Sequence, residues 1–327
     1  MRDNGTSPAQ QLIPEALSHA AARFVDSLRI NSISRAVRRG RQVVIKQRHV
    51  YGEQLTELAN LYFRISGLPI RFWTKKEDWQ RWELNCFKML NGDRFRASRV
   101  RNNAICIDQL PGENLWEHLN RQTLSRRMVE AAGLEFRRAH QFWSKEFRGP
   151  WSHGDAGMAN VIYDETSNRA RLIDFEIVHD KTLPGLSRHA DDLLIFMLDL
   201  IATAQGRQWL PLTLAFLNAY DNAPVIAQLS RQLAPPSGMA WIWWGVRTSF
   251  ANPAKIKQRM TKLQDLTSQL GHYRAVAAAR VRQRRRASII CQQISAGSPR
   301  PISRARQTRD KAKAPSPGMP SKLPTKR

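Results

Sequence analysis

The sequence WSHGDAGMANVIYD at residues 151–164, with RLIDFE at 171–176, holds most of the chain's recognisable motif residues. Asp155 and Asn160 lie five positions apart in a polar loop, and Asp174 follows a short apolar strand. Two adjoining short strands would bring these three side chains together. Transfer of a phosphoryl group needs a carboxylate to orient the acceptor hydroxyl and oxygen ligands for Mg²⁺. The pattern predicts Asp155 in the first role and Asn160 and Asp174 in the second.

A polar turn beside a strand-capping aspartate is the simpler interpretation of the same residues. Such turns are common, but three residues that match three chemical roles in the required order favour the catalytic interpretation. Histidines elsewhere have no spacing typical of metal ligands, so we expect no histidine metal site.

At these positions the chain resembles the protein-kinase-like superfamily. HGD at 153–155 followed by Asn160 is similar to the catalytic loop of its bacterial branch of aminoglycoside phosphotransferases, choline-kinase-like enzymes and lipopolysaccharide-core kinases. DFE at 174–176 resembles the metal-binding segment, with Glu in the third place. The resemblance implies an ATP- and Mg²⁺-dependent kinase with a two-lobed α+β fold. Its acceptor would be a hydroxyl of a non-protein compound, such as a sugar, an aminoglycoside-like compound or a lipopolysaccharide core.

Carried upstream, the resemblance implies a lysine for the nucleotide phosphates and an acidic partner for it. VVIK at 43–46 makes Lys46 the candidate lysine. Glu83 is the candidate partner, because Phe87 and Leu90 follow at +4 and +7 and would anchor that helix in the core. Glu77 is the alternative.

Two further segments resemble parts of the family's scaffold. ICIDQLPGENL resembles the strand and hinge that hold adenine, so Asp108, Gln109 and Leu110 are candidate hinge residues through their backbone groups. HADDLLIFMLDL resembles the helix whose first Asp supports the catalytic loop, which makes Asp192, or Asp191 beside it, structural support. His153 is expected to be scaffolding, because in this family the aspartate handles the proton.

The order of predicted elements indicates an α+β protein with a small strand-rich front and a larger helical back. We expect a hairpin at 31–48, two helices between 53 and 90, a longer helix at 122–143, and short strands around VIYD and RLIDF. The expected regions are a flexible lead-in at 1–22, a nucleotide-binding N-lobe at 23–110, a C-lobe with the catalytic, metal and acceptor sites at 111–272, and a disordered basic tail at 273–327.

Charge and cysteine content set limits on location and partners. The net charge is +25, and residues 274–327 hold fifteen Lys or Arg against one acid, Asp310. Such a tail fits an anionic membrane surface or a glycolipid; nucleic acid is the least supported partner, because aromatic residues do not alternate with the charges. Three separated cysteines, no secretory leader and no long apolar run predict a cytoplasmic protein, with attachment at the inner membrane face as an option.

Two rival functions stay open at this point. A serine/threonine protein kinase that phosphorylates its own tail is one, with RRRAS around Ser288 as the candidate substrate. A pseudokinase that binds nucleotide or anionic partners without catalysis is the other. LRINSIS at 28–34, where the family's phosphate-covering loop is expected, contains no glycine and supports the second rival. An extra helix between Lys46 and Glu83 is also expected.

Overall fold

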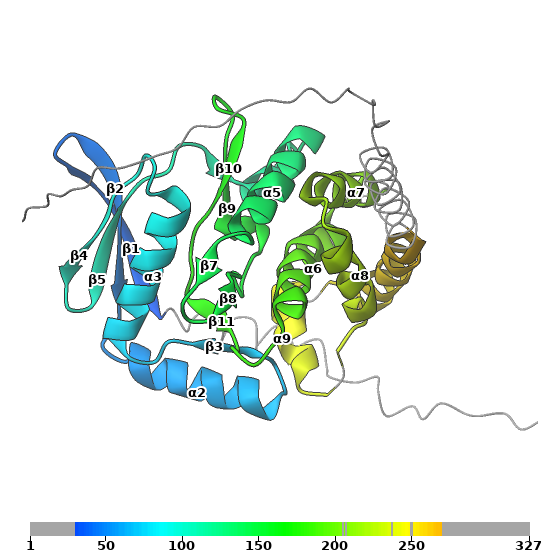
Figure 1. Ribbon diagram of the computed structural model, residues 1–327, viewed down its shortest axis with the longest axis horizontal. Helices are drawn as coiled ribbons and strands as arrows, with labels where there is room; N and C mark the ends of the chain where they lie inside the picture. Colours follow the sequence, from blue (N-terminus) through cyan, green and yellow to red (C-terminus); the bar gives the residue numbers. More distant parts are fainter. Residues whose placement is uncertain (1–29, 205, 207, 237, 249–250, 270–327) are drawn as a thin grey trace, which may run out of the picture. The chain divides into compact units, whose positions relative to one another are not determined.

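The computed structural model describes residues 30–204, 206, 208–236, 238–248 and 251–269 (Figure 1). The chain divides into two units, 1–277 and 278–327, and the described residues all belong to the first. The predicted lead-in and tail therefore lie outside the described residues.

The N-terminal part is built on a four-stranded antiparallel sheet with the order β1-β2-β5-β4. Its strands are β1 (Asn31–Arg38), β2 (Arg41–Arg48), β4 (Ala97–Arg101) and β5 (Ala104–Asp108). One face of the sheet packs on α3 (Lys76–Asn91), which buries Trp79 and Phe87. The helix forms because its apolar residues recur at three- and four-residue steps.

An insertion between β2 and α3 forms a second, smaller core. It consists of α2 (Gly52–Ile65) and β3 (Ile70–Phe72), and β3 pairs antiparallel with β11 (Ile177–His179). Phe63, Phe72 and Ile177 are buried together there. The insertion thereby touches the segment that directly follows Asp174.

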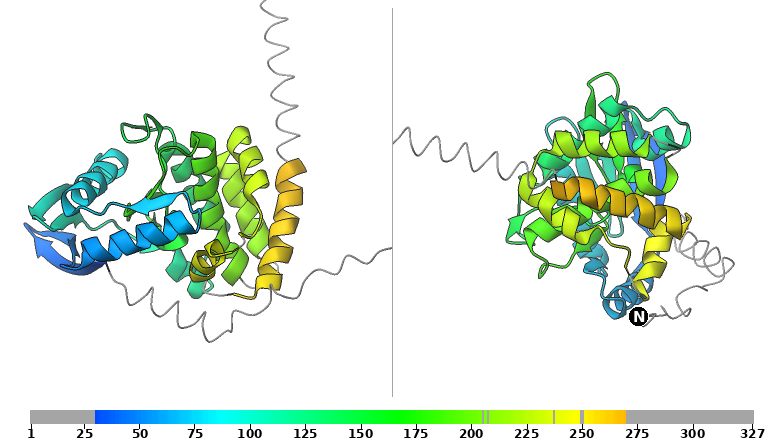
Figure 2. Two further views of the ribbon diagram at one scale, coloured as in Figure 1. Left: turned by 90° about the horizontal axis from the view of Figure 1, so that it is seen from below. Right: turned by 90° about the vertical axis from the view of Figure 1, so that its right-hand side faces the viewer.

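The C-terminal part is mostly helical, and Figure 2 shows its helices side by side. Its elements are β6 (Glu113–Asn114), α4 (Leu115–Asn120), α5 (Arg126–Ala139), β7 (Trp143–Ser144), β8 (Gly149–Pro150), η2 (Met158–Asn160), β9 (Val161–Asp164), β10 (Arg169–Leu172), α6 (Gly185–Thr203), α7 (Trp209–Tyr220), α8 (Ala223–Gln232), α9 (Ala240–Arg247) and a helix at 253–269. Strands β10, β9 and β6 form a three-stranded sheet, and β7 pairs with β8. The main core runs from α3 through β9 and β10 into α6, α7 and α8.

The predicted α+β class, with a strand-rich front and a helical back, is confirmed. The hairpin and both helices of the 53–90 region are also found. The helix expected at 122–143 is shorter, because Ser125 caps its start by accepting from the Met128 N–H and the chain leaves the helix at His140. Strand β3 was not predicted.

The packing of α5 on α7 depends on Gly133. A Cβ built there would lie 2.5 Å from the Phe216 carbonyl oxygen and 2.9 Å from Ala219 Cβ. We expect Gly133→Ala to lower the free energy of unfolding by about 1–3 kcal/mol, despite alanine's better helix propensity. Urea denaturation would measure the loss. Leu134→Ala, at the exposed neighbouring position, is the control, and an equal effect of both variants would contradict this packing.

Candidate functional site

The amino group of Lys46 lies at the centre of the site, where three segments meet. Strand β2 places Lys46 Nζ 2.7 Å from Asp174 Oδ1 and 3.3 Å from Glu83 Oε1, and Glu176 forms a third ion pair with it. Lys46 is 5% exposed. Burial disfavours its charge, but the three carboxylates outweigh that cost and hold the pKa of Lys46 well above its ordinary value.

Glu83 lies on the inward face of α3, as the positions of Phe87 and Leu90 in the sequence predict. Glu83 is 3% exposed, and its second carboxylate oxygen accepts a hydrogen bond from the Phe175 N–H at 3.0 Å. Burial raises the pKa of Glu83 to about 7, although Lys46 opposes the shift. Glu83 thus links the lysine to the segment that carries Asp174. Glu77, the alternative, lies in the first turn of α3 and makes no ion pair with Lys46.

The segment after β10 supplies two carboxylates rather than one. Asp174 has a left-handed backbone, with φ of 62°, and its side chain is 36% exposed. Glu176 contacts both Lys46 and the side-chain amide of Asn31 in β1. Burial raises the pKa of Glu176. From the sequence, Glu176 was only the third residue of DFE, and its contact with Lys46 was not predicted.

Asp155 and Asn160 are held together in the loop before β9. The Asn160 side-chain Nδ2 donates to the Asp155 carbonyl oxygen at 2.8 Å. The backbone N–H of Ile173 donates to the Asn160 carbonyl oxygen at 3.0 Å, so Asp174 follows directly after this contact. The structure therefore brings together Asp155, Asn160 and Asp174, as the spacing predicted.

Asp192 in α6 supports the loop from below. Its Oδ2 accepts from the His153 N–H and its Oδ1 from the Gly154 N–H, both at 2.8 Å, while His140 Nε2 lies 3.0 Å away. Burial alone would raise the pKa of Asp192, but the surrounding histidines and hydrogen bonds hold it well below its usual range. The neighbouring Asp191 pairs instead with His179.

His153 and Gly154 have contacts that suit a scaffold. His153 Nε2 donates to the Ile173 carbonyl oxygen at 2.9 Å, and its Nδ1 accepts from the Asp155 N–H at 3.2 Å. Both ring nitrogens are occupied, and burial lowers the pKa of His153, which keeps the ring neutral. Gly154 has φ of 89°, and a Cβ there would lie 2.6 Å from the Ile177 carbonyl oxygen. An arginine at this position would not fit.

The predicted hinge lies at the end of β5. The Asp108 N–H donates to the Arg96 carbonyl oxygen and the Gln109 N–H to the Gln42 carbonyl oxygen, so the backbone donors of both residues are in use. Among the hydrogen bonds of the described residues, none uses the N–H of Leu110. Of the three predicted hinge residues, Leu110 is therefore the one whose backbone N–H is left for another acceptor in the described structure.

Two charged residues near Asp155 were missed by the sequence reasoning. Arg247 in α9 places Nη1 3.0 Å from Asp155 Oδ1, and Asp199 in α6 accepts from the Met158 N–H at 2.7 Å. Burial raises the pKa of Asp199 to about 7. Asp199 lies in the segment HADDLLIFMLDL, from which only Asp191 and Asp192 were singled out, and Arg247 comes from a helix with no legible motif.

The donor set fits Mg²⁺. Asn160 offers its amide oxygen, because its nitrogen already donates to Asp155, and Asp174 offers a partly exposed carboxylate. Mg²⁺ needs only one or two protein oxygens when phosphates and waters complete its shell. Three carboxylates also surround the single positive charge of Lys46, so the cluster carries an excess of negative charge that a bound cation would neutralise. No cluster of three or more His, Cys, Asp or Glu that could hold a metal by itself occurs in the described part of the chain.

Comparison with known proteins finds only distant structural similarity. No protein-family model matches the chain, and no curated protein sequence matches it. A solved ethanolamine kinase from Plasmodium vivax is 9% identical, with a TM-score of 0.39 over 79% of this chain and 89% of that one. APH(2″)-IIa in a ternary complex with streptomycin and ATP is 13% identical, with a TM-score of 0.35 over 78% and 96%.

A Mycobacterium tuberculosis protein solved with erythromycin is 13% identical, with a TM-score of 0.32 over 56% of this chain. The chain spans 51% of that protein. TM-scores below 0.5 support no conclusion about fold or activity, so the function proposed below rests on the contacts around Lys46 and Asp155.

The raised pKa of Asp199 predicts a pH dependence of stability. Between its ordinary value of 3.8 and about 7, the folded chain holds a proton that the unfolded chain has lost. The free energy of unfolding therefore falls as pH rises through this range. The fall is about 1.4 kcal/mol for each pH unit and up to about 4 kcal/mol in total. Asp199→Asn removes this proton but keeps an acceptor for the Met158 N–H.

We expect the stability of Asp199→Asn relative to the wild type to rise between pH 5 and pH 7.5. Guanidinium denaturation at both pH values would measure it. Stability–pH curves that run parallel for the two proteins would contradict the assignment of this proton to Asp199.

Proposed function

We propose that the chain is an ATP- and Mg²⁺-dependent phosphotransferase that acts on a hydroxyl of a non-protein acceptor, such as a sugar, an aminoglycoside-like compound or a lipopolysaccharide core. The observation that carries the proposal is the ion-pair cluster of Lys46 with Glu83 and Asp174. It joins strand β2, helix α3 and the segment after β10 at one buried point. The loop that holds Asp155 and Asn160 is joined to the segment that carries Asp174 by the Ile173–Asn160 backbone hydrogen bond.

Each side chain has a role in this mechanism. Lys46 holds the α- and β-phosphates of ATP, Glu83 fixes Lys46, and the backbone at 108–110 holds the adenine ring. Asn160 and Asp174 would hold Mg²⁺, which neutralises phosphate charge when bound. Asp155 orients the acceptor hydroxyl and takes its proton as the hydroxyl oxygen bonds to the γ-phosphorus and the bond to the β-phosphate oxygen breaks. Positioning and charge neutralisation supply most of the acceleration.

The surroundings of Asp155 favour a small acceptor over a peptide. Helix α9, which carries Arg247 to Asp155, is fastened to the inserted α2: Tyr62 donates to the Met239 carbonyl oxygen at 2.8 Å, and the rings of Phe63 and Trp243 meet edge to face at 4.9 Å. Only residues 180–184 connect β11 to α6. This short connection leaves little platform for a peptide, which argues against a serine/threonine protein kinase.

The partners suggested by composition stay proposals. A glycolipid acceptor and contact of the basic tail with an anionic membrane surface rest on the charge of residues 273–327, which lie outside the described residues. We also propose a cytoplasmic location, on the cysteine pattern. No helix in the described part of the chain has the length and apolar character needed to cross a membrane.

The pseudokinase alternative rests on the glycine-free segment before Lys46. Residues 31–38 form the continuous strand β1 and not an open backbone loop that could cover phosphates. The Asn31 side chain contacts Glu176. Retention of the full set of charged residues around Lys46 and Asp155 argues for catalysis. Catalytic turnover separates the two.

The proposed role of Asp155 predicts the outcome of one substitution. Asp155→Ala removes the group that orients the hydroxyl and accepts its proton, so we expect at least about a hundredfold loss in transfer rate. The measurement is transfer of labelled γ-phosphate from ATP to small molecules and lipopolysaccharide in a bacterial extract. Asp164→Ala is the control, because the Asp164 carboxylate accepts its hydrogen bonds from Thr166 and Ser167 at the end of β9.

Equal transfer by wild type and Asp155→Ala would refute the catalytic role. Label found only on Ser288 of the chain itself would support the protein-kinase alternative instead.

A further inference from the structure

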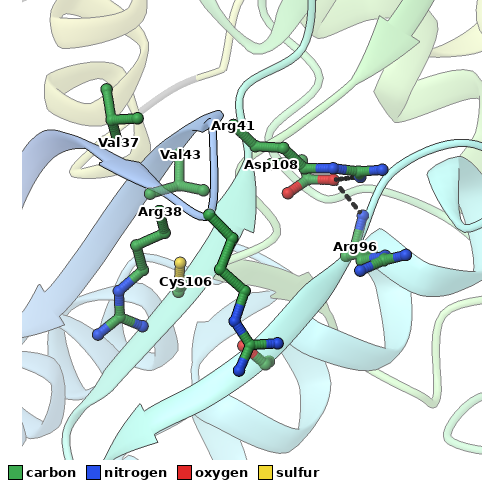
Figure 3. A pocket seen from close by; sticks show the side chains of 9 residues that line it. Val37, Arg38, Arg41, Val43, Arg96, Cys106 and Asp108 are labelled. Carbon is green, nitrogen blue, oxygen red and sulfur yellow. Dashed lines mark hydrogen bonds and ion pairs between the residues drawn. The ribbon is translucent and has the colours of Figure 1, made fainter.

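A basic pocket lies at the end of the N-terminal sheet where a turn joins β1 to β2 (Figure 3). Its volume is about 730 Å³, within the usual range for small-molecule sites. Val43 and Cys106, both buried, form an apolar floor. The walls hold four arginines and a single carboxylate; they are Arg38, Arg39, Arg41, Arg96 and Asp108.

The pocket is separate from the Lys46 site. Side chains alternate between the two faces of a strand, so Val43 and Lys46, three positions apart, point to opposite faces of β2. The pairing of Val43 with Asp108 across the sheet puts Asp108 on the pocket face as well. Lys46 instead faces α3, where it meets Glu83. The pocket therefore lies on the other side of the sheet from the proposed phosphate-binding lysine.

The positive charge in the pocket exceeds its negative charge. Asp108 Oδ2 is occupied by Arg41 Nη1 at 2.8 Å and by the Arg96 backbone N–H at 2.9 Å. No carboxylate among the described residues forms an ion pair with the guanidinium groups of Arg38, Arg39 or Arg96. Three guanidinium groups thus remain around one hollow, and each presents donors suited to phosphate oxygens.

The backbone that presents two of these arginines is a tight turn. Arg39 and Gly40 have φ of 49° and 74°, and Arg38 pairs with Arg41 across the hairpin. Positive φ at both central residues is the geometry of the two-residue turns that match strand twist. The turn limits the backbone motion that would otherwise oppose binding of an anion.

We propose that this pocket binds a phosphorylated small molecule or headgroup, with its phosphate on Arg38, Arg39 and Arg96 and its apolar part on Val43 and Cys106. The proposal does not depend on the function proposed for the Lys46 site. Because Asp108 belongs both to the pocket wall and to the predicted hinge, an occupant would lie directly against the nucleotide-binding strand β5.

The test measures binding of two probes that share a phosphate monoester. Glycerol 3-phosphate represents a free phosphate, and dioctanoyl phosphatidic acid below its micelle concentration represents a lipid headgroup. Titration calorimetry on the full chain at 50 mM salt compares wild type with the triple variant Arg38→Gln, Arg39→Asn, Arg96→Gln. Asn-Gly is a favoured sequence for such a turn, so Arg39→Asn removes charge without weakening the hairpin.

Two control proteins make the result specific. Arg64→Gln, Arg99→Gln, Arg101→Gln removes the same charge from exposed positions outside the pocket. Lys46→Met disables the proposed nucleotide site. Far-UV circular dichroism and thermal melts establish that each variant is folded.

We expect wild type to bind at least one probe, the pocket variant to bind it at least about tenfold more weakly, and both controls to stay within about twofold of wild type. Tighter binding of phosphatidic acid would identify a lipid headgroup, and equal binding a free phosphate ester. Equal weakening in the surface-charge control, loss of binding in Lys46→Met, or no binding of either probe by wild type would each overturn the proposal.

Discussion

One buried lysine among carboxylates is the interaction on which the rest of the site depends. Lys46 is almost inaccessible to water, and a buried charge is costly unless it is paired. Glu83 from α3 and Asp174 from the segment after β10 supply that pairing, so the lysine fixes helix α3, strand β2 and the segment after β10 relative to one another. The cluster holds more negative than positive charge, which makes it suited to a bound cation.

The loop that carries Asp155 is held in place by hydrogen bonds to Asp192 of α6. Both carboxylate oxygens of Asp192 accept backbone N–H groups from 153–154, and His140 approaches the same carboxylate from α5. Such a buried, satisfied network holds its members in one arrangement. Asp155 is left partly exposed at the top of this network, beside Arg247. The loop is therefore held from below and accessible above, which suits the in-line transfer to an external hydroxyl that we propose.

Patterns with a regular period or a fixed spacing were readable from the sequence. The phase of the α3 apolar residues singled out Glu83, and the motif spacing placed Asp155, Asn160 and Asp174 together. Arg247 could not be found in this way, because α9 carries no motif, and Asp199 was passed over because the motif of its helix directs attention only to the first acidic residues, Asp191 and Asp192. Strand β3 was missed for a related reason: its three residues form a strand only because β11 pairs with them. The basic pocket likewise depends on strand register, which brings Arg96 to the hairpin arginines.

We propose that the Lys46 cluster, with Asp174, binds ATP through Mg²⁺. Titration calorimetry of ATP in the presence and absence of Mg²⁺, on wild type and on Asp174→Asn, measures this dependence. We expect Mg²⁺ to strengthen ATP binding to wild type at least about tenfold and Asp174→Asn to lose this effect. ATP affinity that does not respond to Mg²⁺ in wild type, or that responds equally in both proteins, would contradict it.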